Sequence, residues 1–159
     1  MNSEYLKVSR EGAKDAKNLD VEELSAIVVD AAFHIHKELG PGLLESVYEA
    51  VLARTLEKRY LKGERQKSVG FTFDGMLFEE GLRLDILVNE KLVVELKSVE
   101  TLAPVHGKQV LTYLRLLDLP LGLLVNFGSS TFKEGTKRIV NNHTSFASSS
   151  LRVNQSPPA

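Results

Sequence analysis

The stretch RLDILVNEKLVVELKSVE, residues 83–100, decides the fold and also carries unusual chemistry. It is strongly apolar, yet it contains two acids and a base at Asp85, Glu95 and Lys97. Charged side chains within buried strands are costly unless they are paired or bind a metal ion. The three charges therefore lie either on a solvated face or in a functional site.

Turn geometry fixes how this stretch folds back on itself. If residues 89–91 form the loop of a hairpin, Val88 pairs with Leu92. Counting outward from that pair sets Asp85 directly across from Glu95. Opposed residues share one face of a sheet, with Cβ atoms about 4.5–5.5 Å apart. A shift of one residue would place the two carboxylates on opposite faces, so the pattern favours the register that brings the acids together.

Side chains alternate along each strand, which gives the hairpin one charged and one apolar face. Arg83 and Lys97, opposite each other, join the two acids on the charged face. A solvated lattice of surface charges is one interpretation, because charges are common on exposed sheet faces. Against it, Leu87 and Val93 flank the charges, and a chain of this size with helices tends to cover both sheet faces. The apolar face is made by Leu84, Ile86, Val88, Leu92, Val94 and Leu96.

Two opposed carboxylates repel each other, so a shared proton, neighbouring cations or a divalent metal must offset the repulsion. Oxygen ligands without an available thiol suit Mg²⁺ or Mn²⁺. Lys97, two residues past Glu95 on the same face, would place an ammonium group beside such a metal. That combination suits phosphoryl chemistry, in which a metal polarises a phosphate and activates water while a lysine stabilises negative charge.

Length and composition bound the class of protein. The chain has 159 residues, which predicts one domain, and no cysteine, which excludes disulfides and cysteine-based zinc sites. The polar N-terminal segment lacks a signal region, and no apolar run reaches the roughly 20 residues that span a bilayer. We therefore expect no membrane association and a cytoplasmic location. The net charge of −1 gives no global argument for nucleic acid, so any polyanion site must be local.

Composition also divides the chain into three parts. Residues 1–18 are polar and charged, and we expect a flexible leader there. Residues 143–159 are rich in Ser, Asn and Pro, which predicts a disordered tail. Residues 19–142 then form the folded domain.

Local signals predict two helices at the start of this domain. Asp20 and Glu23 have the spacing of a capping box, and Gly40 suits the left-handed conformation that ends the first helix. The second helix is expected from about Leu43 to Leu61. Its expected buried side consists of Leu44, Val47, Tyr48, Val51 and Leu56.

Strand signals follow the two helices. Asp74-Gly75 is the strongest short hairpin signal in the chain. The run 121–127 is continuously apolar, which predicts a strand buried on both faces. The expected order is four strands (68–73, 76–81, 82–88 and 92–99), a helix (105–119), a strand (121–127) and a short helix within 131–141.

Asp85, a tight turn and the sequence Glu-Leu-Lys at 95–97 resemble the motif of the PD-(D/E)xK nuclease superfamily, with Leu84 in place of its proline. The order of helix, three strands, helix and strand around it also resembles that superfamily. The sequence GLLESVY, residues 42–48, is similar to the defining motif of the GxxExxY protein family, a small bacterial branch of the superfamily. The resemblance covers about residues 24–142.

The resemblance implies an α/β (α+β) fold with a restriction-endonuclease-like core, in which helices flank a central mixed sheet of four to five strands. It implies a nuclease that hydrolyses phosphodiester bonds with Mg²⁺ or Mn²⁺ as cofactor. The implied partner is nucleic acid, with DNA favoured over RNA. A homodimer is also compatible with it, since small members of the superfamily frequently dimerise.

The same resemblance implies a site, residue by residue. Asp85 and Glu95 would hold the metal, with the backbone carbonyl of Leu96 as a further ligand. Lys97 would orient the attacking water or stabilise the transition state. Glu45 would supply an additional acid, binding a second metal directly or through water. The alternative for Glu45 is structural, because a carboxylate is favoured in the first turn of a helix.

Further residues have weaker assignments. Gln109 and Tyr113 resemble the Q-x-x-x-Y element of recombination-type exonucleases, which lies beside the site and contacts the nucleic acid or orients the lysine. They could equally form a polar helix face. Tyr48 is expected in the core, and His106 could reach the site or cap its helix. The densest basic stretch, residues 57–67, is either a solvated helix end or the best candidate for backbone contact.

Three hypotheses follow. The first is a metal-dependent nuclease. The second is a catalytically silent nuclease fold that binds nucleic acid or a protein partner. The third is a purely structural cluster of charges.

Overall fold

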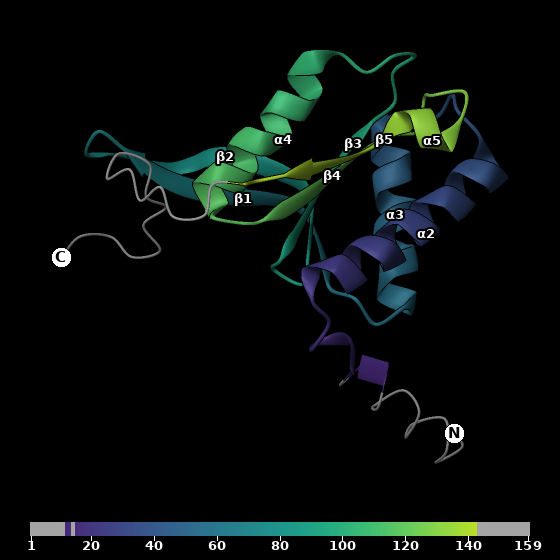
Figure 1. Cartoon of the computed structure of the whole chain (residues 1–159), viewed down its shortest axis with the longest axis horizontal. Coiled ribbons are helices and arrows are strands. Elements are labelled where there is room, and N and C mark those ends of the chain that lie inside the picture. The colour runs from purple at the N-terminus through teal and green to yellow at the C-terminus, as the bar shows by residue number, and fades with distance from the viewer. Residues whose placement is uncertain (1–11, 14, 143–159) are drawn as a thin grey trace.

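A computed structural model describes residues 12–13 and 15–142 of the chain. Figure 1 shows an elongated sheet with a pair of helices on one side and a single long helix on the other. Along the chain, the elements are α2 (Val21–Leu39), α3 (Glu45–Lys58), β1 (Gly63–Phe73), β2 (Met76–Val88), β3 (Leu92–Lys97), α4 (Pro104–Leu117), β4 (Leu121–Asn126), α5 (Phe132–Gly135) and β5 (Thr136–Val140).

The sheet has five strands in the spatial order β1-β2-β3-β4-β5. Strands β3 and β4 are parallel and are linked by α4, whereas the other neighbours are antiparallel. The expectation of a mixed sheet of four to five strands flanked by helices is therefore confirmed. Strand β4 is buried at every residue, as its continuously apolar sequence predicts.

Two apolar clusters cover the two faces of this sheet. The larger one packs α2 and α3 on one face, and its central side chains include Leu24, Leu52 and Val94. The smaller one packs α4 on the other face, through Val110 and Leu114. Because both faces are covered, side chains of the central strands are buried whichever way they point.

The helix starts and faces follow the sequence only in part. The capping box of α2 is present, since Asp20 and Glu23 each accept a hydrogen bond from the other's backbone N–H at 2.8 Å. Helix α3 starts two residues later than expected, at Glu45. Its buried stripe holds Tyr48 and Leu56 as predicted. The prediction was wrong for Leu44 and Val47, which are 74% and 40% exposed.

The expected boundary between strands at residues 81 and 82 is wrong, because 76–88 form one strand. Gly81 marks a close approach and not a turn: a Cβ there would lie 2.2 Å from the ring of Phe71 on β1. The last expected helix, within 131–141, is also wrong in large part. Only the four residues of α5 are helical, and 136–140 form β5 at the edge of the sheet.

The ends of the domain can be compared with the expected leader and tail. Of the leader, residues 1–11 and 14 lie outside the described residues, as does the whole tail, 143–159. Ala16 is buried in the larger cluster, and its carbonyl accepts a hydrogen bond from Asn89 Nδ2 at 2.9 Å. The packed domain therefore includes the end of the segment expected to be a leader. None of the described helices is long and apolar enough to cross a membrane.

Candidate active site

The site lies where β2 separates from β3. These strands pair through three residue pairs, and the register is the one that the loop at 89–91 predicts. Beyond them, β2 continues alongside β1 only. Where the backbone pairing of β2 with β3 ends, the side chain of Asp85 still links the two strands, since its Oδ2 accepts a hydrogen bond from the backbone N–H of Leu96 at 2.8 Å. The ladder pairs are Ile86 with Val94, Leu87 with Val93, and Val88 with Leu92.

The alternation of side chains between the two faces of β2 is interrupted where β2 separates from β3. Leu84, which we expected beside Ile86 on the apolar face, packs instead in the smaller cluster under α4 together with Leu87. On β1, the residue between the partners of Leu84 and Ile86 is Gln66, whose φ of +49° is unusual for a non-glycine residue within a strand. Asp85 thus occupies an irregular position in the sheet, and regular alternation fails for that reason.

Glu95 is the most deeply buried charged group of the site, at 3% exposure. Lys97 Nζ lies 3.4 Å from Glu95 Oε1, and Glu95 Oε2 has no hydrogen-bond partner within the described part of the chain. Burial, and then the charge of Asp85, raise the pKa of Glu95 to about 7. Burial also raises the pKa of Asp85, against the opposing effects of the Leu96 N–H and the Lys97 ammonium.

Glu45 opens α3 and faces the same group of charges. Burial raises its pKa, the charge of Lys97 lowers it, and the charge of Asp85 raises it further. The start of α3 is tied to the end of β3, because Ser98 Oγ donates a hydrogen bond to the Leu43 carbonyl at 2.7 Å. The structure therefore brings Glu45 close to Asp85 and Lys97, although the three come from different elements.

Tyr48 holds the loop that precedes Glu45. Its hydroxyl donates to the Gly40 carbonyl at 2.6 Å and accepts the Leu43 N–H at 3.2 Å. Its ring is fully buried and stacks on Phe127, with centroids 4.4 Å apart and planes at 2°. Gly42, within the loop, has a φ of +111°, which favours glycine. Tyr48 is thus a core residue, as expected, and it also fixes the loop.

Asn126 fixes the segment that follows Lys97 on the other side of the site. It is fully buried at the end of β4. Its Oδ1 accepts the N–H groups of Val99 and Gly128 at 3.0 and 3.1 Å, and its Nδ2 donates to the carbonyl of Val99 and Oγ of Ser129 at 2.8 Å each. All its hydrogen-bonding capacity serves this one corner of the fold.

Gln109 and Tyr113 share one face of α4, as their spacing predicts. Gln109 Nε2 donates to the Tyr113 hydroxyl at 2.7 Å. Burial raises the pKa of Tyr113, and the next cause is the negative charge of Glu95. Tyr113 is therefore near enough for the charges of Glu95 and Asp85 to raise its pKa, and Gln109 bonds to Tyr113. His106 does not join them through a recorded bond: its Nδ1 accepts the Ala103 N–H at 3.1 Å and caps the helix.

Two residues of this region, Glu49 and Gln66, were not anticipated. Glu49 is 4% exposed, accepts hydrogen bonds from Arg65 Nε at 2.9 Å and Gln66 Nε2 at 2.6 Å, and its charge raises the pKa of Asp85. The Gln66 side chain also hydrogen-bonds to Asp85. A signal existed for Glu49, since it lies four residues after Glu45 and thus on the same helix face. No sequence signal marks the left-handed backbone of Gln66.

The donor set can be tested for a divalent metal ion. The described residues contain no cluster of three or more His, Cys, Asp or Glu side chains placed to hold one. The Asp85–Glu95 pair nonetheless fits such an ion, because it offers hard oxygen ligands, one buried oxygen without a partner, and carboxylates whose repulsion a cation would relieve. Glu45 could complete such a set only by moving closer.

Comparison with known proteins bears on the family and the fold of the chain. No curated protein and no solved structure matches the chain significantly. The family model of the PD-(D/E)XK nuclease superfamily matches residues 22–139, a range that contains the whole site. The five-stranded sheet and its flanking helices are consistent with the restriction-endonuclease-like fold of such enzymes. The chain therefore belongs to the PD-(D/E)XK nuclease superfamily, and this membership points to nuclease activity in general terms.

Proposed function

We propose that the protein is a metal-dependent nuclease that hydrolyses phosphodiester bonds, with DNA as the preferred substrate. The observation that carries this proposal is the buried pair of Asp85 and Glu95 with Lys97 beside it and one Glu95 oxygen left without a partner. A purely structural cluster of charges would be expected to satisfy that oxygen. A site that receives an ion is expected to leave it open.

The proposed ligands are the carboxylates of Asp85 and Glu95 and the backbone carbonyl of Leu96, with Glu45 as an additional acid. Mg²⁺ or Mn²⁺ bound there would polarise the phosphate and lower the pKa of a water molecule. Lys97 contributes a fixed positive charge 3.4 Å from Glu95, where it stabilises the negative charge that develops during hydrolysis. Burial strengthens this effect because the local dielectric is low.

Gln109 and Tyr113 are the proposed contacts to the nucleic acid. Their hydrogen-bonded pair presents a hydroxyl and an amide next to Glu95. Both groups can donate to a phosphate oxygen. We also propose that the chain belongs to the GxxExxY branch, because Gly42 adopts a left-handed φ, Glu45 faces the acids and Tyr48 ties the loop between them.

A panel of nucleic acids tests the function. Single-stranded, duplex and branched DNA and the corresponding RNAs are incubated with Mg²⁺ or Mn²⁺, and cleavage is followed over time. We expect Lys97→Ala to lose cleavage by a factor of about 10² to 10³, as removal of a charge-stabilising group does elsewhere. Lys133→Ala, an exposed lysine on α5, is the control. Equal rates in wild type and Lys97→Ala would refute the assignment.

A second candidate is a nuclease fold that binds nucleic acid or a protein without turnover. It is favoured by the near-neutral net charge and by the absence of a three-acid metal cluster in the described parts of the chain. Calorimetric titration with Mg²⁺ and Mn²⁺, comparing wild type with Asp85→Asn, separates the candidates. Metal binding that depends on Asp85 supports the nuclease, and its absence supports the binding module. A homodimer and a cytoplasmic location stay predictions.

A further inference from the structure

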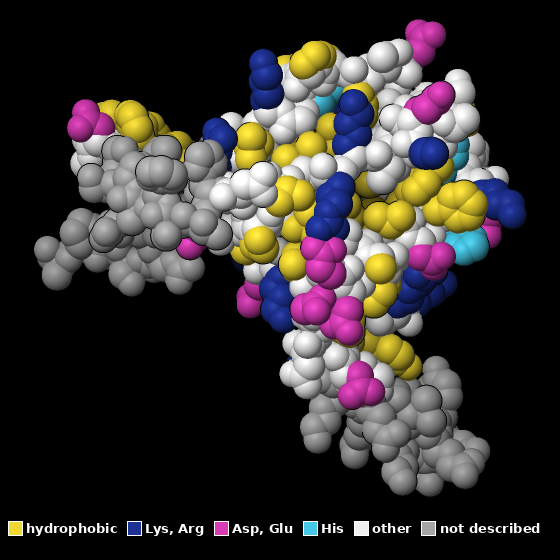
Figure 2. Space-filling model, in the orientation of Figure 1, with side chains coloured by type: hydrophobic (Ala, Val, Ile, Leu, Met, Phe, Trp, Pro, Cys, Tyr) yellow, Lys and Arg dark blue, Asp and Glu magenta, His cyan; other side chains and the backbone are white. Residues whose placement is uncertain are grey.

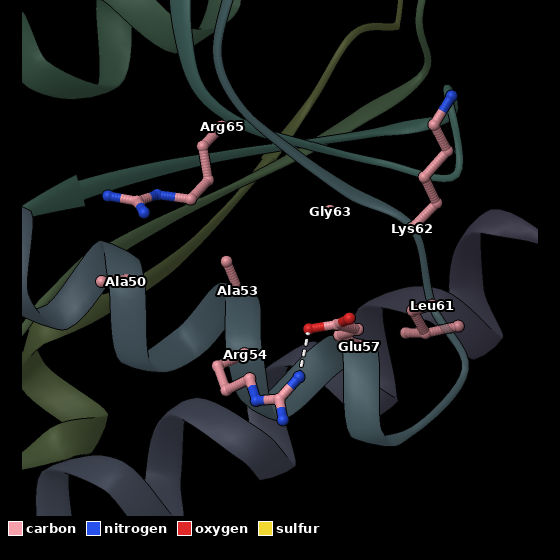
Figure 3. A pocket seen from close by; sticks show the side chains of 8 residues that line it. All are labelled: Ala50, Ala53, Arg54, Glu57, Leu61, Lys62, Gly63 and Arg65. Atoms are coloured by element: carbon pink, nitrogen blue, oxygen red, sulfur yellow. Dashed lines mark hydrogen bonds and ion pairs between the residues drawn. The ribbon is translucent and has the colours of Figure 1, made fainter.

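A pocket lies between the outer side of α3 and the beginning of β1, next to the candidate site. Its volume is about 390 Å³. Figure 3 shows Arg65 and Ala50 at one end and Lys62 and Leu61 at the other, with Ala53 between them. The pocket thus has three cationic side chains, one carboxylate and a lining of small residues. It is lined by Ala50, Ala53, Arg54, Glu57, Leu61, Lys62, Gly63 and Arg65.

The cations around this pocket are held loosely enough to accept another anion. Arg54 pairs with Glu57 at 2.7 Å, but both side chains are about two-thirds exposed. Lys62 lies 3.4 Å from Glu64 and 3.8 Å from Glu90 and is 63% exposed. Exposed pairs of this kind contribute little stability, so a phosphate can replace the partner at low cost.

Arg65 connects the pocket with the acids of the site. It pairs with Ile86 in the β1–β2 ladder, so it lies across from the residue next to Asp85. Its Nε donates to Glu49, and neither of its η nitrogens donates a hydrogen bond to a described residue. Glu49 in turn affects the pKa values of Asp85 and Glu45. The end of the pocket at Arg65 is therefore next to the acidic residues of the candidate site.

We propose that this pocket binds phosphates of the nucleic-acid backbone on one side of the scissile bond. The inference rests on the proposed nuclease function and deepens it, because it assigns a path for the substrate strand. Arg54, Lys62 and Arg65 supply positive charge, while Ala50, Ala53 and Gly63 leave room for sugar and phosphate. The small side chains cannot read a base edge, and contacts of the cations with phosphates carry no sequence information.

This assignment also accounts for how a chain with a net charge of −1 can hold a polyanion. On the face shown in Figure 2, Lys and Arg side chains are interspersed with acidic and apolar ones, without one broad basic area. Binding must then come from a local group of cations. The densest basic stretch of the sequence, residues 57–67, contributes two of the three cations in the pocket, Lys62 and Arg65.

The test measures binding and cleavage in parallel with the full chain. Binding of a short labelled DNA, single-stranded or duplex, is followed by fluorescence anisotropy on a Lys97→Ala background with Mg²⁺, which prevents turnover. Salt is varied between about 50 and 200 mM. A plot of log affinity against log salt has a negative slope, and each lost phosphate contact makes it shallower by about 1. Cleavage is measured with Lys97 present.

The informative variant is Arg54→Gln with Lys62→Gln, since both side chains are exposed and their loss leaves the fold intact. The matched control is Lys133→Gln with Lys137→Gln, which removes the same charge from exposed positions on α5 and β5. We expect the pocket variant to bind at least about tenfold more weakly at low salt. Its salt dependence should also be shallower, with a slope smaller in magnitude by about 2. The control should keep the parental affinity.

The outcomes separate this inference from the proposed function. Pocket-dependent binding together with cleavage supports both. If binding depends on the pocket but no cleavage occurs with either metal ion, the role of the pocket is supported and the nuclease function is refuted. Cleavage with equal binding by pocket and control variants overturns the pocket alone. Pocket-dependent binding of a nucleoside monophosphate, with unchanged binding of the oligonucleotides, also overturns it, in favour of a small-anion site.

Discussion

The backbone N–H of Leu96 donates a 2.8 Å hydrogen bond to Oδ2 of Asp85, beyond the last ladder pair of β2 and β3. A side chain therefore continues the connection between two strands that are already separating. The charges of Asp85 and Lys97 also affect each other's surroundings, since Lys97 lowers the pKa of Asp85 and Asp85 raises that of Glu95. The bond orients Asp85 without neutralising it, and burial still raises its pKa.

Glu95 makes the stability of the metal-free protein dependent on pH. Its folded-state pKa of about 7 exceeds the ordinary value of 4.5, so the folded protein binds the proton more tightly. The resulting stabilisation is fully present below about pH 4.5 and is lost as the pH rises through 7, by roughly 3 kcal/mol. Denaturation by urea in EDTA between pH 5 and 8 measures it. Glu95→Gln should flatten this dependence, whereas exposed Glu38→Gln should leave it intact; parallel profiles for all three proteins would contradict the raised pKa.

Divalent metal should reverse that loss at high pH. An ion bound to Asp85 and Glu95 favours their charged forms, so its affinity should rise between pH 5 and 8. At a concentration 100 times its dissociation constant, the ion adds about 2.7 kcal/mol to the stability of the folded state. Thermal unfolding with Mg²⁺ and with EDTA shows the difference. Asp85→Asn should abolish it, and an equal gain in that variant would place the ion elsewhere.

The Tyr48→Phe variant tests the contribution of the hydroxyl separately from that of the ring. The stacking on Phe127 remains, but the Gly40 carbonyl and the Leu43 N–H lose their partner. We expect a loss of about 1–3 kcal/mol in urea denaturation and a lower cleavage rate, because the loop that positions Glu45 loosens.

Tyr113→Phe is the contrasting variant. Its hydroxyl is only half-buried and bonds to Gln109, so stability should change less and cleavage more. The assignment of Tyr48 would be wrong if the two variants had the same stability.

Asn126→Asp keeps the shape of the side chain and removes its donor. The carbonyl of Val99 and the hydroxyl of Ser129 then meet a carboxylate at a fully buried position. An uncompensated buried charge should cost about 3 kcal/mol or more at pH 8. Asn142→Asp, exposed beyond β5, is the control. Equal unfolding midpoints for the two variants would show that the corner after Lys97 does not depend on Asn126.

Gln66 offers a test of the strained backbone. Its φ of +49° favours glycine, while its side chain donates to Glu49. Gln66→Gly and Gln66→Ala lose the same side-chain hydrogen bonds, to Glu49 and Asp85, but only alanine retains the backbone strain. We expect the glycine variant to be more stable by about 1 kcal/mol, which reverses the usual preference within strands. Both should cleave more slowly. An alanine variant at least as stable as glycine would refute the left-handed conformation.

Much of the site could be predicted because its geometry is local. The loop at 89–91 was enough to predict the register of the three ladder pairs between β2 and β3, whereas side-chain alternation fails next to Asp85, at Leu84. The spacing of Gln109 and Tyr113 predicted their shared helix face. Such inferences need only the period of a strand or a helix.

The remainder depended on contacts between distant segments. Gly81 resembles a strand end in sequence, but the ring of Phe71 across the ladder is what requires a glycine there. Leu44 reads as part of an apolar helix face, yet the loop held by Tyr48 starts the helix after it. The positive φ of Gln66 has no local cause at all. Tertiary packing determines each of these three features, and the periodicity of a sequence carries no information about contacts between distant segments.

The continuity of β2 has a structural consequence. This strand runs for 13 residues, from the exposed tip of the β1–β2 hairpin to the buried centre of the sheet, and Asp85 lies on it where β3 is lost as a neighbour. The hairpin and the candidate catalytic acid are therefore parts of one continuous strand without an intervening loop, although its ladder with β1 shifts register between Val69 and Phe71. A partner bound at the tip, which Figure 1 shows projecting from the sheet, would therefore be joined to Asp85 by an unbroken strand.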